Sequence, residues 1–328
     1  MNDFAATLQT YFTSHATSQR GLSPNTIASY RDTWRLFIRH LADEGVSPDK
    51  AGFADLRPDT VAGFLEMLQT TRGNSDTTRN ARLAAIKAVA RYALPNHPDR
   101  SHDLTQILAL PTKRATKTDP VFLTPEETEL LLAAPDTTTW TGRRDQAMLA
   151  LAAQTGLRIS ELTTLATSDL HLARPARVHA TGKGRKHRDT PLTGPTITLM
   201  RAYLAERATR PGHALFPGPR GNPLSRDAVE RRLTKHLAAA ATKNPALARK
   251  NISMHALRHT AAMRLLEAGV DIAVIALWLG HEHTTTTDRY LHAHLGLKQA
   301  ALDRTRPPDV TPGVYTPTPD VLAWLDRL

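Results

Sequence analysis

The sequence contains no cysteine and no long hydrophobic run. The absence of cysteine excludes disulfide bonds, thiolate zinc fingers, iron–sulfur clusters and a cysteine nucleophile. The longest strongly apolar run, Ile272–Leu279, is far too short to span a membrane. The segment MNDFAATLQTYF shows no basic stretch followed by an apolar one, which is the pattern of a secretory signal. We therefore expect a soluble cytoplasmic protein with no membrane partner.

Acidic residues are also in short supply. The 328 residues include 31 Asp and Glu against 42 Lys and Arg, which gives a formal net charge of +11. A positive surplus of this size favours a polyanionic partner, most often nucleic acid, although a generally basic protein from a GC-rich genome would look similar. With 41% hydrophobic residues the chain can bury a real core, and its length predicts two domains.

Proline-rich segments divide the chain. Residues 111–120 (PTKRATKTDP) are polar, basic and bracketed by prolines, and a second proline-rich segment covers residues 306–319. Prolines lack the N–H group that packed elements need, so these segments predict linkers. We therefore expect a helical domain at 1–110, a linker at 111–120, a second domain at 121–305 and a tail at 306–328 that ends in a short helix.

Hydrophobic periodicity predicts a mostly α fold with a small antiparallel β-sheet. Ser23 and Pro24 are typical of a helix start, and apolar residues then recur at helical spacing until Gly45. Residues 177–181 and 188–192 flank a Gly-Lys-Gly turn, as in a β-hairpin. In the second domain, a Thr-Pro-Glu-Glu capping box at 124–127 begins one helix. Further helices are predicted at about 143–154, 195–210, 225–240, 253–268, 271–279 and 287–293.

One predicted helix of the first domain is surrounded by cations. Its apolar positions include Leu83 and Ile86. An ordinary solvated face would explain the cations, but the overall charge favours a surface that faces phosphates. The predicted DNA-binding residues on this helix, and on the turn of the hairpin, are Arg79, Arg82, Lys87, Arg91, Arg185 and Lys186.

Five short motifs carry the residues that suggest chemistry. They contain Arg158, Lys183, His255, Arg258, His281 and Tyr290. Two guanidinium groups can each fork onto the oxygens of one phosphate and neutralise its growing charge. A tyrosine hydroxyl can attack phosphorus, and a lysine can protonate the leaving oxygen. This set performs phosphodiester transfer without a metal or another cofactor.

Each motif is weak by itself, because Arg-x-Ser-Glu-Leu often begins a surface helix and Gly-Lys-Gly is often a plain turn. Together they occur in one order, with intervals of 25 residues from Arg158 to Lys183, 3 from His255 to Arg258, 23 from Arg258 to His281 and 9 from His281 to Tyr290. With these spacings the sequence resembles the tyrosine recombinases of the phage integrase family, and in pattern the Xer-type and transposon-integrase branch. The stretch LSPNTIASYRDTWRLFIRHL resembles the family's core-binding domain.

The resemblance implies a site-specific recombinase or integrase that clamps DNA between two domains. Arg158 and Arg258 would hold the scissile phosphate, and Tyr290 would attack it to form a 3′-phosphotyrosine. Lys183 would be the general acid, His255 and His281 would assist, and Glu161 would orient the site as a supporting residue. The implied partners are double-stranded DNA with inverted repeats and further copies of the chain, a dimer on one site and a tetramer in the synapse that proceeds through a Holliday junction. A nucleoid-associated location follows.

Three other interpretations are open. A type IB topoisomerase shares the same constellation and relaxes DNA without exchanging strands. A catalytically silent DNA-binding regulator is the second, although all six catalytic positions are filled. A zinc enzyme is the third, because His281-Glu282-His283 and His292-Ala293-His294 place histidines close together, but the spacing is not that of H-E-x-x-H. The final helix could dock on its own domain or on a neighbouring copy.

Overall fold

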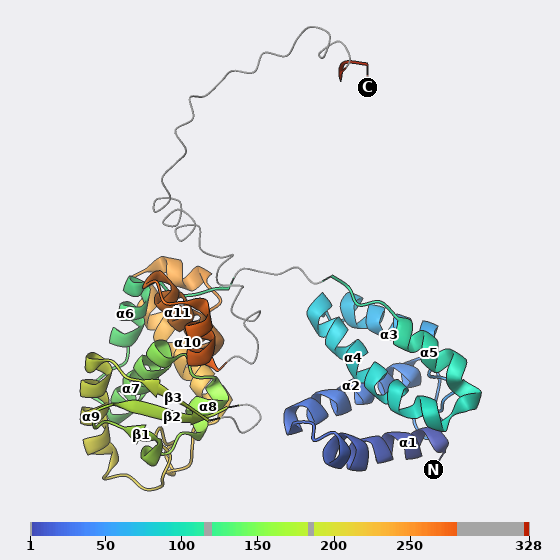
Figure 1. Cartoon of the computed structure of the whole chain (residues 1–328), viewed down its shortest axis with the longest axis horizontal. Coiled ribbons are helices and arrows are strands. Elements are labelled where there is room, and N and C mark those ends of the chain that lie inside the picture. The colour runs from blue at the N-terminus through green and yellow to red at the C-terminus, as the bar shows by residue number, and fades with distance from the viewer. Residues whose placement is uncertain (1, 115–119, 183–186, 281–324, 328) are drawn as a thin grey trace. The chain divides into compact units, whose positions relative to one another are not determined.

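The computed structural model describes residues 2–114, 120–182, 187–280 and 325–327. The chain divides into two units, residues 1–117 and 118–328, each with its own set of contacts (Figure 1). The described residues are mostly helical with a small antiparallel sheet, which confirms the predicted fold class. Within these ranges, no helix is both long and apolar enough to cross a bilayer. The helix predicted at 287–293 and most of the predicted tail lie outside the described residues.

Unit 1 is built from amphipathic helices whose apolar faces meet in one core. Ser23 begins the longest helix as predicted, because its hydroxyl accepts a hydrogen bond from the Thr26 backbone N–H at 3.2 Å and Pro24 occupies the first turn. Phe37 of that helix packs edge to face on Phe64, with ring centroids 5.3 Å apart. The α-helices of this unit are α1 (Asp3–Thr10), α2 (Pro24–Asp43), α3 (Pro58–Thr70), α4 (Asp76–Ala93) and α5 (Ser101–Ala109).

The predicted linker begins as part of unit 1. The Lys113 backbone N–H donates to the Asn80 side chain at 3.0 Å, and the Asn80 amide returns a hydrogen bond to the Lys113 carbonyl at 2.7 Å. The Lys113 ammonium also donates to Gln69 at 2.7 Å. Residues 111–114 are therefore held against α4, although their composition alone predicts a free connection.

Unit 2 packs helices around a three-stranded antiparallel sheet in the order β1-β2-β3. Strand β2 (Arg177–Thr181) has the predicted bounds, and β3 (His187–Pro191) begins one residue earlier than predicted. Sequence reasoning missed β1 (Leu170–His171), because two residues give no measurable alternation. The helices are α6 (Pro125–Ala133), α7 (Trp140–Thr155), α8 (Ile159–Thr164), α9 (Gly194–Arg207), α10 (Arg226–Ala241), α11 (Met254–Glu267) and α12 (Ile272–Leu279).

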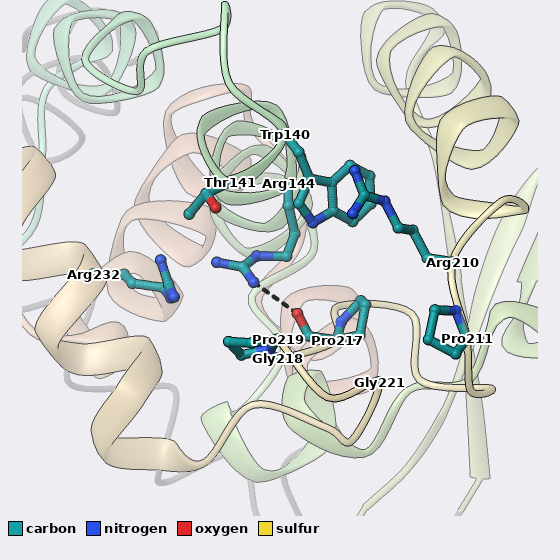
Figure 2. Close-up of a pocket in the computed structure, with 10 residues that line it drawn as sticks. All are labelled: Trp140, Thr141, Arg144, Arg210, Pro211, Pro217, Gly218, Pro219, Gly221 and Arg232. Carbon is teal, nitrogen blue, oxygen red and sulfur yellow. Dashed lines mark hydrogen bonds between the residues drawn. The ribbon is translucent and has the colours of Figure 1, made fainter.

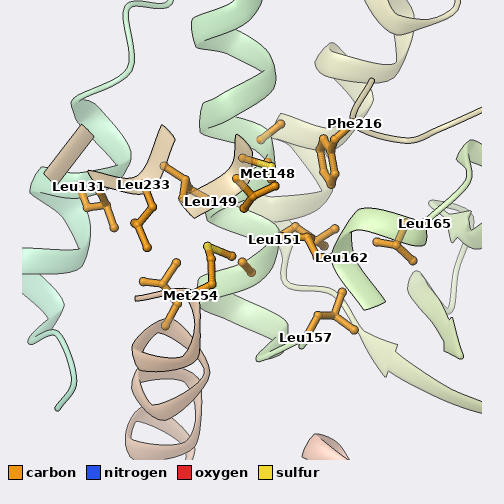
Figure 3. Packing of buried hydrophobic residues seen from close by; sticks show 14 of the residues in the cluster. Leu131, Met148, Leu149, Leu151, Leu157, Leu162, Leu165, Phe216, Leu233 and Met254 are labelled. Atoms are coloured by element: carbon orange, nitrogen blue, oxygen red, sulfur yellow. The ribbon is translucent and has the colours of Figure 1, made fainter. Parts of the chain in front are cut away.

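Helix α7 forms the centre of unit 2. Its side chains are buried on all faces because Ala, Leu and Met occupy nearly every position from Ala147 to Ala153. Figure 3 shows Met148 and Leu151 with Leu233 and Met254 on one side and Phe216 on the other. Because α7 is enclosed by its neighbours, it also fixes the position of the chain turn that follows Thr155.

Candidate active site

The chain turns sharply at the end of α7 and presents Arg158. Gly156 ends the helix in the left-handed conformation, with φ of +65°, as its sequence position predicts. A Cβ at this position would lie 2.6 Å from the Leu279 side chain, so glycine is required for space as well as for backbone angle. Arg158 follows two residues later as the N-cap of α8.

The two predicted clamp arginines come together at the end of α12. Arg258 is only 2% exposed, and its guanidinium donates to the Gly156 carbonyl at 2.7 Å and to the Leu279 carbonyl at 2.6 Å. Arg158 donates to the next carbonyl, that of Gly280, at 3.0 Å. The two guanidinium groups therefore meet consecutive carbonyls of one chain turn, although 100 residues separate them in sequence.

This chain turn leads directly to the next predicted catalytic residue. Gly280 ends α12 with φ of +64°, which confirms the predicted helix stop. His281 is the next residue in the chain and, like Lys183 and Tyr290, lies outside the described residues. The structure thus brings Arg158 and Arg258 together at the attachment point of His281, and the catalytic roles of all six residues stay predictions.

Glu161 binds Arg158 through its carboxylate. Its buried carboxylate accepts hydrogen bonds from the Arg158 backbone N–H and side chain, both at 2.8 Å. It also accepts a two-pronged pair from Arg188 on β3, at 3.0 and 2.7 Å. Burial alone would raise the pKa of Glu161, but the bonds from Arg188 and Arg158 outweigh it, so its pKa lies below the ordinary value. The carboxyl group is therefore ionised at neutral pH.

Sequence reasoning missed Arg188 as a site residue. It was assigned to a strand, and nothing in the spacing of 27 residues between Glu161 and Arg188 indicates contact. The only sequence signal for Arg188 is its place on the strand that follows the predicted catalytic residue Lys183, and that signal is weak.

His255 lies in the first turn of α11, exposed and next to buried His259. The two imidazole rings pack edge to face with centroids 4.3 Å apart. Ser253 holds the N-cap position, but its side chain makes no capping hydrogen bond. Glu230 of α10 replaces it, since its carboxylate accepts from the Met254 backbone N–H at 3.2 Å. The start of α11 is thus fixed by a neighbouring helix.

The predicted DNA-binding cations of α4 make contacts within unit 1. Arg82 donates to the Ser29 carbonyl at 3.2 Å, and Lys87 donates to the Leu110 carbonyl at 2.6 Å. Burial lowers the pKa of Lys87, and the neighbouring charge of Arg91 lowers it further. Arg79 reaches the Pro111 carbonyl at 3.4 Å, whereas Arg91 is exposed. Arg185 and Lys186 lie outside the described residues.

A second cluster of arginines lies at the opposite end of α7, roughly 24 Å from Gly156 at the rise of an α-helix. It borders a cavity of about 290 Å³. Figure 2 shows the Arg144 guanidinium directed at the Pro217 carbonyl, to which it donates at 2.7 Å. Arg144 and Arg232 also bind the buried Asp145 carboxylate, and Arg210 lies over the Trp140 ring at 4.7 Å. None of the predicted catalytic residues lines this cavity, so it is not the candidate active site.

No group of three potential metal ligands occurs within the described ranges. The His281–His283 and His292–His294 pairs, on which the zinc interpretation depended, lie outside them. The described part of the candidate site consists of two arginines, Arg158 and Arg258, and the carboxylate of Glu161.

Comparisons with known proteins agree with this arrangement. Residues 121–295 match the description "Phage integrase family", and residues 10–97 match "Phage integrase, N-terminal SAM-like domain". A Sinorhizobium fredii protein described as an integrase/recombinase, y4rC, is 43% identical over 99% of this chain and 98% of its own length. Tyrosine recombinase XerC of Pelobacter propionicus is 33% identical over 92% of this chain and 95% of its own length.

Solved structures share the fold. The Tn1549 transposon integrase in complex with transposon right end DNA has a TM-score of 0.68 at 18% identity, covering 91% of this chain and 98% of that one. The XerH recombinase bound to palindromic difH substrate, a post-cleavage complex, has a TM-score of 0.67 at 21% identity, covering 87% of this chain and 81% of that one. At these identities the likeness shows the architecture alone.

Proposed function

Because the chain belongs to the phage integrase family and is a tyrosine-type site-specific DNA recombinase, we propose that it cuts and rejoins DNA through a 3′-phosphotyrosine intermediate. The observation that carries this proposal is the meeting of Arg158 and Arg258 at the carbonyls of Leu279 and Gly280. The guanidinium groups of these two arginines are held at the carbonyls just before His281, where they form a site for a phosphate whose negative charge increases during the reaction.

The chemistry follows from the residue types. The phenol oxygen of Tyr290 attacks the scissile phosphorus, and the bond from phosphorus to the 5′ oxygen breaks. Lys183 gives its proton to that departing oxygen, His255 takes the proton of the phenol and hydrogen-bonds the phosphate, and His281 positions the phosphate and the tyrosine. The phosphotyrosine conserves the energy of the broken bond, so a 5′-hydroxyl from a second strand displaces the tyrosine and restores the DNA backbone without ATP.

Positive charge supports double-stranded DNA as the substrate. The net charge of +11 favours a polyanion, and both structural relatives named above are described as complexes with DNA. We propose a recombination site with inverted repeats, bound by a dimer, and a tetramer when two sites exchange strands through a Holliday junction. We propose that both units, 1–117 and 118–328, bind the duplex. Such a substrate places the protein in the cytoplasm, on the nucleoid.

The test is covalent capture on a nicked duplex built from inverted repeats found beside the gene. Wild-type protein should leave an SDS-stable protein–DNA adduct, because the nicked strand diffuses away and prevents religation. Tyr290→Phe should bind the same duplex and form no adduct, since it lacks the attacking oxygen. Tyr315→Phe, which removes a tyrosine from the proline-rich tail, is the matched control and should retain the adduct.

Two results would contradict the proposal. An adduct in Tyr290→Phe would remove the nucleophile assignment. Relaxation of a supercoiled plasmid that lacks the repeats, at the rate of one that contains them, would instead indicate a topoisomerase of type IB.

A further inference from the structure

Arg188 touches three chain segments that carry predicted catalytic residues. Its side chain is only 12% exposed, and its two terminal nitrogens bind the two oxygens of Glu161 at 3.0 and 2.7 Å. A Cβ built on Gly280 would lie 2.9 Å from Nη1 of Arg188, so the guanidinium lies directly against the residue that precedes His281. Its own strand returns from the turn that carries Lys183, and its backbone pairs with Ala180 across the hairpin.

The charge balance around Glu161 explains what a second arginine does there. Each carboxylate oxygen accepts one bond from Arg158 and one from Arg188. The Glu161 side chain is only 2% exposed, so little water is available to screen its charge. If Arg158 were the only cation bound to Glu161, the carboxylate would cancel the positive charge that Arg158 would present to the phosphate. With Arg188 present, the three groups retain a net charge of +1, and Arg158 keeps one third of its surface exposed at 33%.

We propose that Arg188 is a positioning residue for the strand-cleavage reaction, which acts through Glu161 to hold the Arg158 guanidinium oriented toward the DNA phosphate and offsets the negative charge of the carboxylate. The inference rests on the proposed function, which supplies the phosphate. A two-pronged arginine–carboxylate pair fixes both position and angle, which a lysine at the same place cannot do. Arg188 also lies against Gly280, the last described residue before His281.

Substitution of Arg188 tests this role on the nicked duplex described above. In Arg188→Met, binding of the duplex should be unchanged and the rate of adduct formation should fall by about ten- to hundredfold, the usual effect of losing a partner that orients a site residue. Arg188→Lys should recover only part of the rate, because it restores the charge without the fork. Arg177→Met is the matched control, since Arg177 lies on the same hairpin in an exposed pair with Asp189 and should cleave at the wild-type rate.

A double-substitution cycle separates positioning from simple loss of stability. If Arg188 acts through Glu161, then Arg188→Met should cost little in a Glu161→Gln background, because no buried carboxylate remains to compete for Arg158. Full additivity of the two losses, or a wild-type cleavage rate in Arg188→Met, would overturn the proposal. The two failures are distinguishable, since absence of a Tyr290-dependent adduct in wild-type protein would reject the proposed function, whereas an adduct that is indifferent to Arg188 would reject the positioning role alone.

Discussion

Two equally buried carboxylates, one in the first half of α7 and one just past its last residue, are each bound by two arginines. Asp145, in the first half of the helix, binds Arg144, Arg232 and His236, and Glu161, just past its end, binds Arg158 and Arg188. Both carboxylate side chains are 2% exposed. Each carboxylate has one better-covered and one more exposed arginine, Arg144 at 3% and Arg232 at 25% on Asp145, and Arg188 at 12% and Arg158 at 33% on Glu161.

Neither burial nor pKa distinguishes the Asp145 cluster from the cluster that contains the predicted clamp residue Arg158. Burial would raise the pKa of Asp145, but bonds from His236 and the two arginines outweigh it, so its pKa lies below the ordinary value, as for Glu161. Low pKa values therefore do not tell the two clusters apart. What tells them apart is the neighbouring chain, because Arg158 donates to Gly280, the residue before the predicted catalytic residue His281, whereas none of the predicted catalytic residues lines the cavity beside Arg144 and Arg232.

Removal of Asp145 should have the largest effect on stability. Asp145→Ala leaves buried cations without their anion, so we expect the free energy of unfolding of unit 2 to fall by about 3–5 kcal/mol. Urea unfolding measures the loss, and cleavage per folded molecule should not change. Asp189→Ala, which breaks an exposed pair with Arg177 and His179, is the control and should alter stability little. A loss no larger than that of the control would contradict the cluster's structural role.

Replacement of Arg258 should have the largest effect on chemistry. Arg258→Lys loses the fork that joins Gly156 and Leu279, so we expect the cleavage barrier to rise by about 3–4 kcal/mol, on the scale of one preorganised charge stabiliser. Arg207→Lys is the matched control, because Arg207 is an equally buried arginine that also donates to carbonyls, those of Ala214 and Gly212. The control should lose stability and retain the cleavage rate. A rate loss below tenfold in Arg258→Lys would exclude the clamp role.

Protonation is a milder change that acts on both clusters together. Each carboxyl group has a folded-state pKa below its reference value, which is 4.5 for Glu161 and 3.8 for Asp145. The folded protein therefore binds fewer protons than the unfolded chain, and the stability from each group is present above these values and lost as the pH falls through the folded-state pKa. Thermal unfolding from pH 7 to pH 3 should show a falling Tm in the acid range, with a shallower fall in Glu161→Gln and Asp145→Asn. Unchanged slopes in both variants would contradict the pKa directions.

Local signals in the sequence predicted the parts of the site that depend on single residues. Gly156 and Gly280 end their helices as predicted, since only glycine adopts the left-handed conformation readily, and the capping box at Thr124 is present. Arg158 and Arg258 were identified by residue type and spacing. The helix ends at Gly156 and Gly280 and the capping box at Thr124 depend only on neighbouring residues, so a sequence pattern can predict them.

Contacts between distant elements could not be predicted. The pairing of Arg188 with Glu161 depends on how a strand meets α8, and the capping of Met254 by Glu230 depends on how α10 meets α11. In the same way, periodicity places Lys87 on a polar face but cannot show that the Leu110 carbonyl accepts a hydrogen bond from its ammonium group. Periodicity reports which side of a helix is apolar and gives no information on what a polar side chain reaches.

Substitution of Arg91 or Lys87 on α4 should have the smallest effect of the changes considered. The two variants compare an exposed cation with one that is hydrogen-bonded within the protein. Arg91 is exposed, so Arg91→Gln should weaken binding to the recombination duplex and reduce the slope of log affinity against log salt by about 1 if it meets one phosphate. Lys87 donates to Leu110 at 2.6 Å, so Lys87→Gln should lower the stability of unit 1 and leave the salt slope unchanged. Equal reductions of the slope in both variants would show that Lys87 exchanges its carbonyl for DNA, because counterion release depends on phosphate contacts and not on stability.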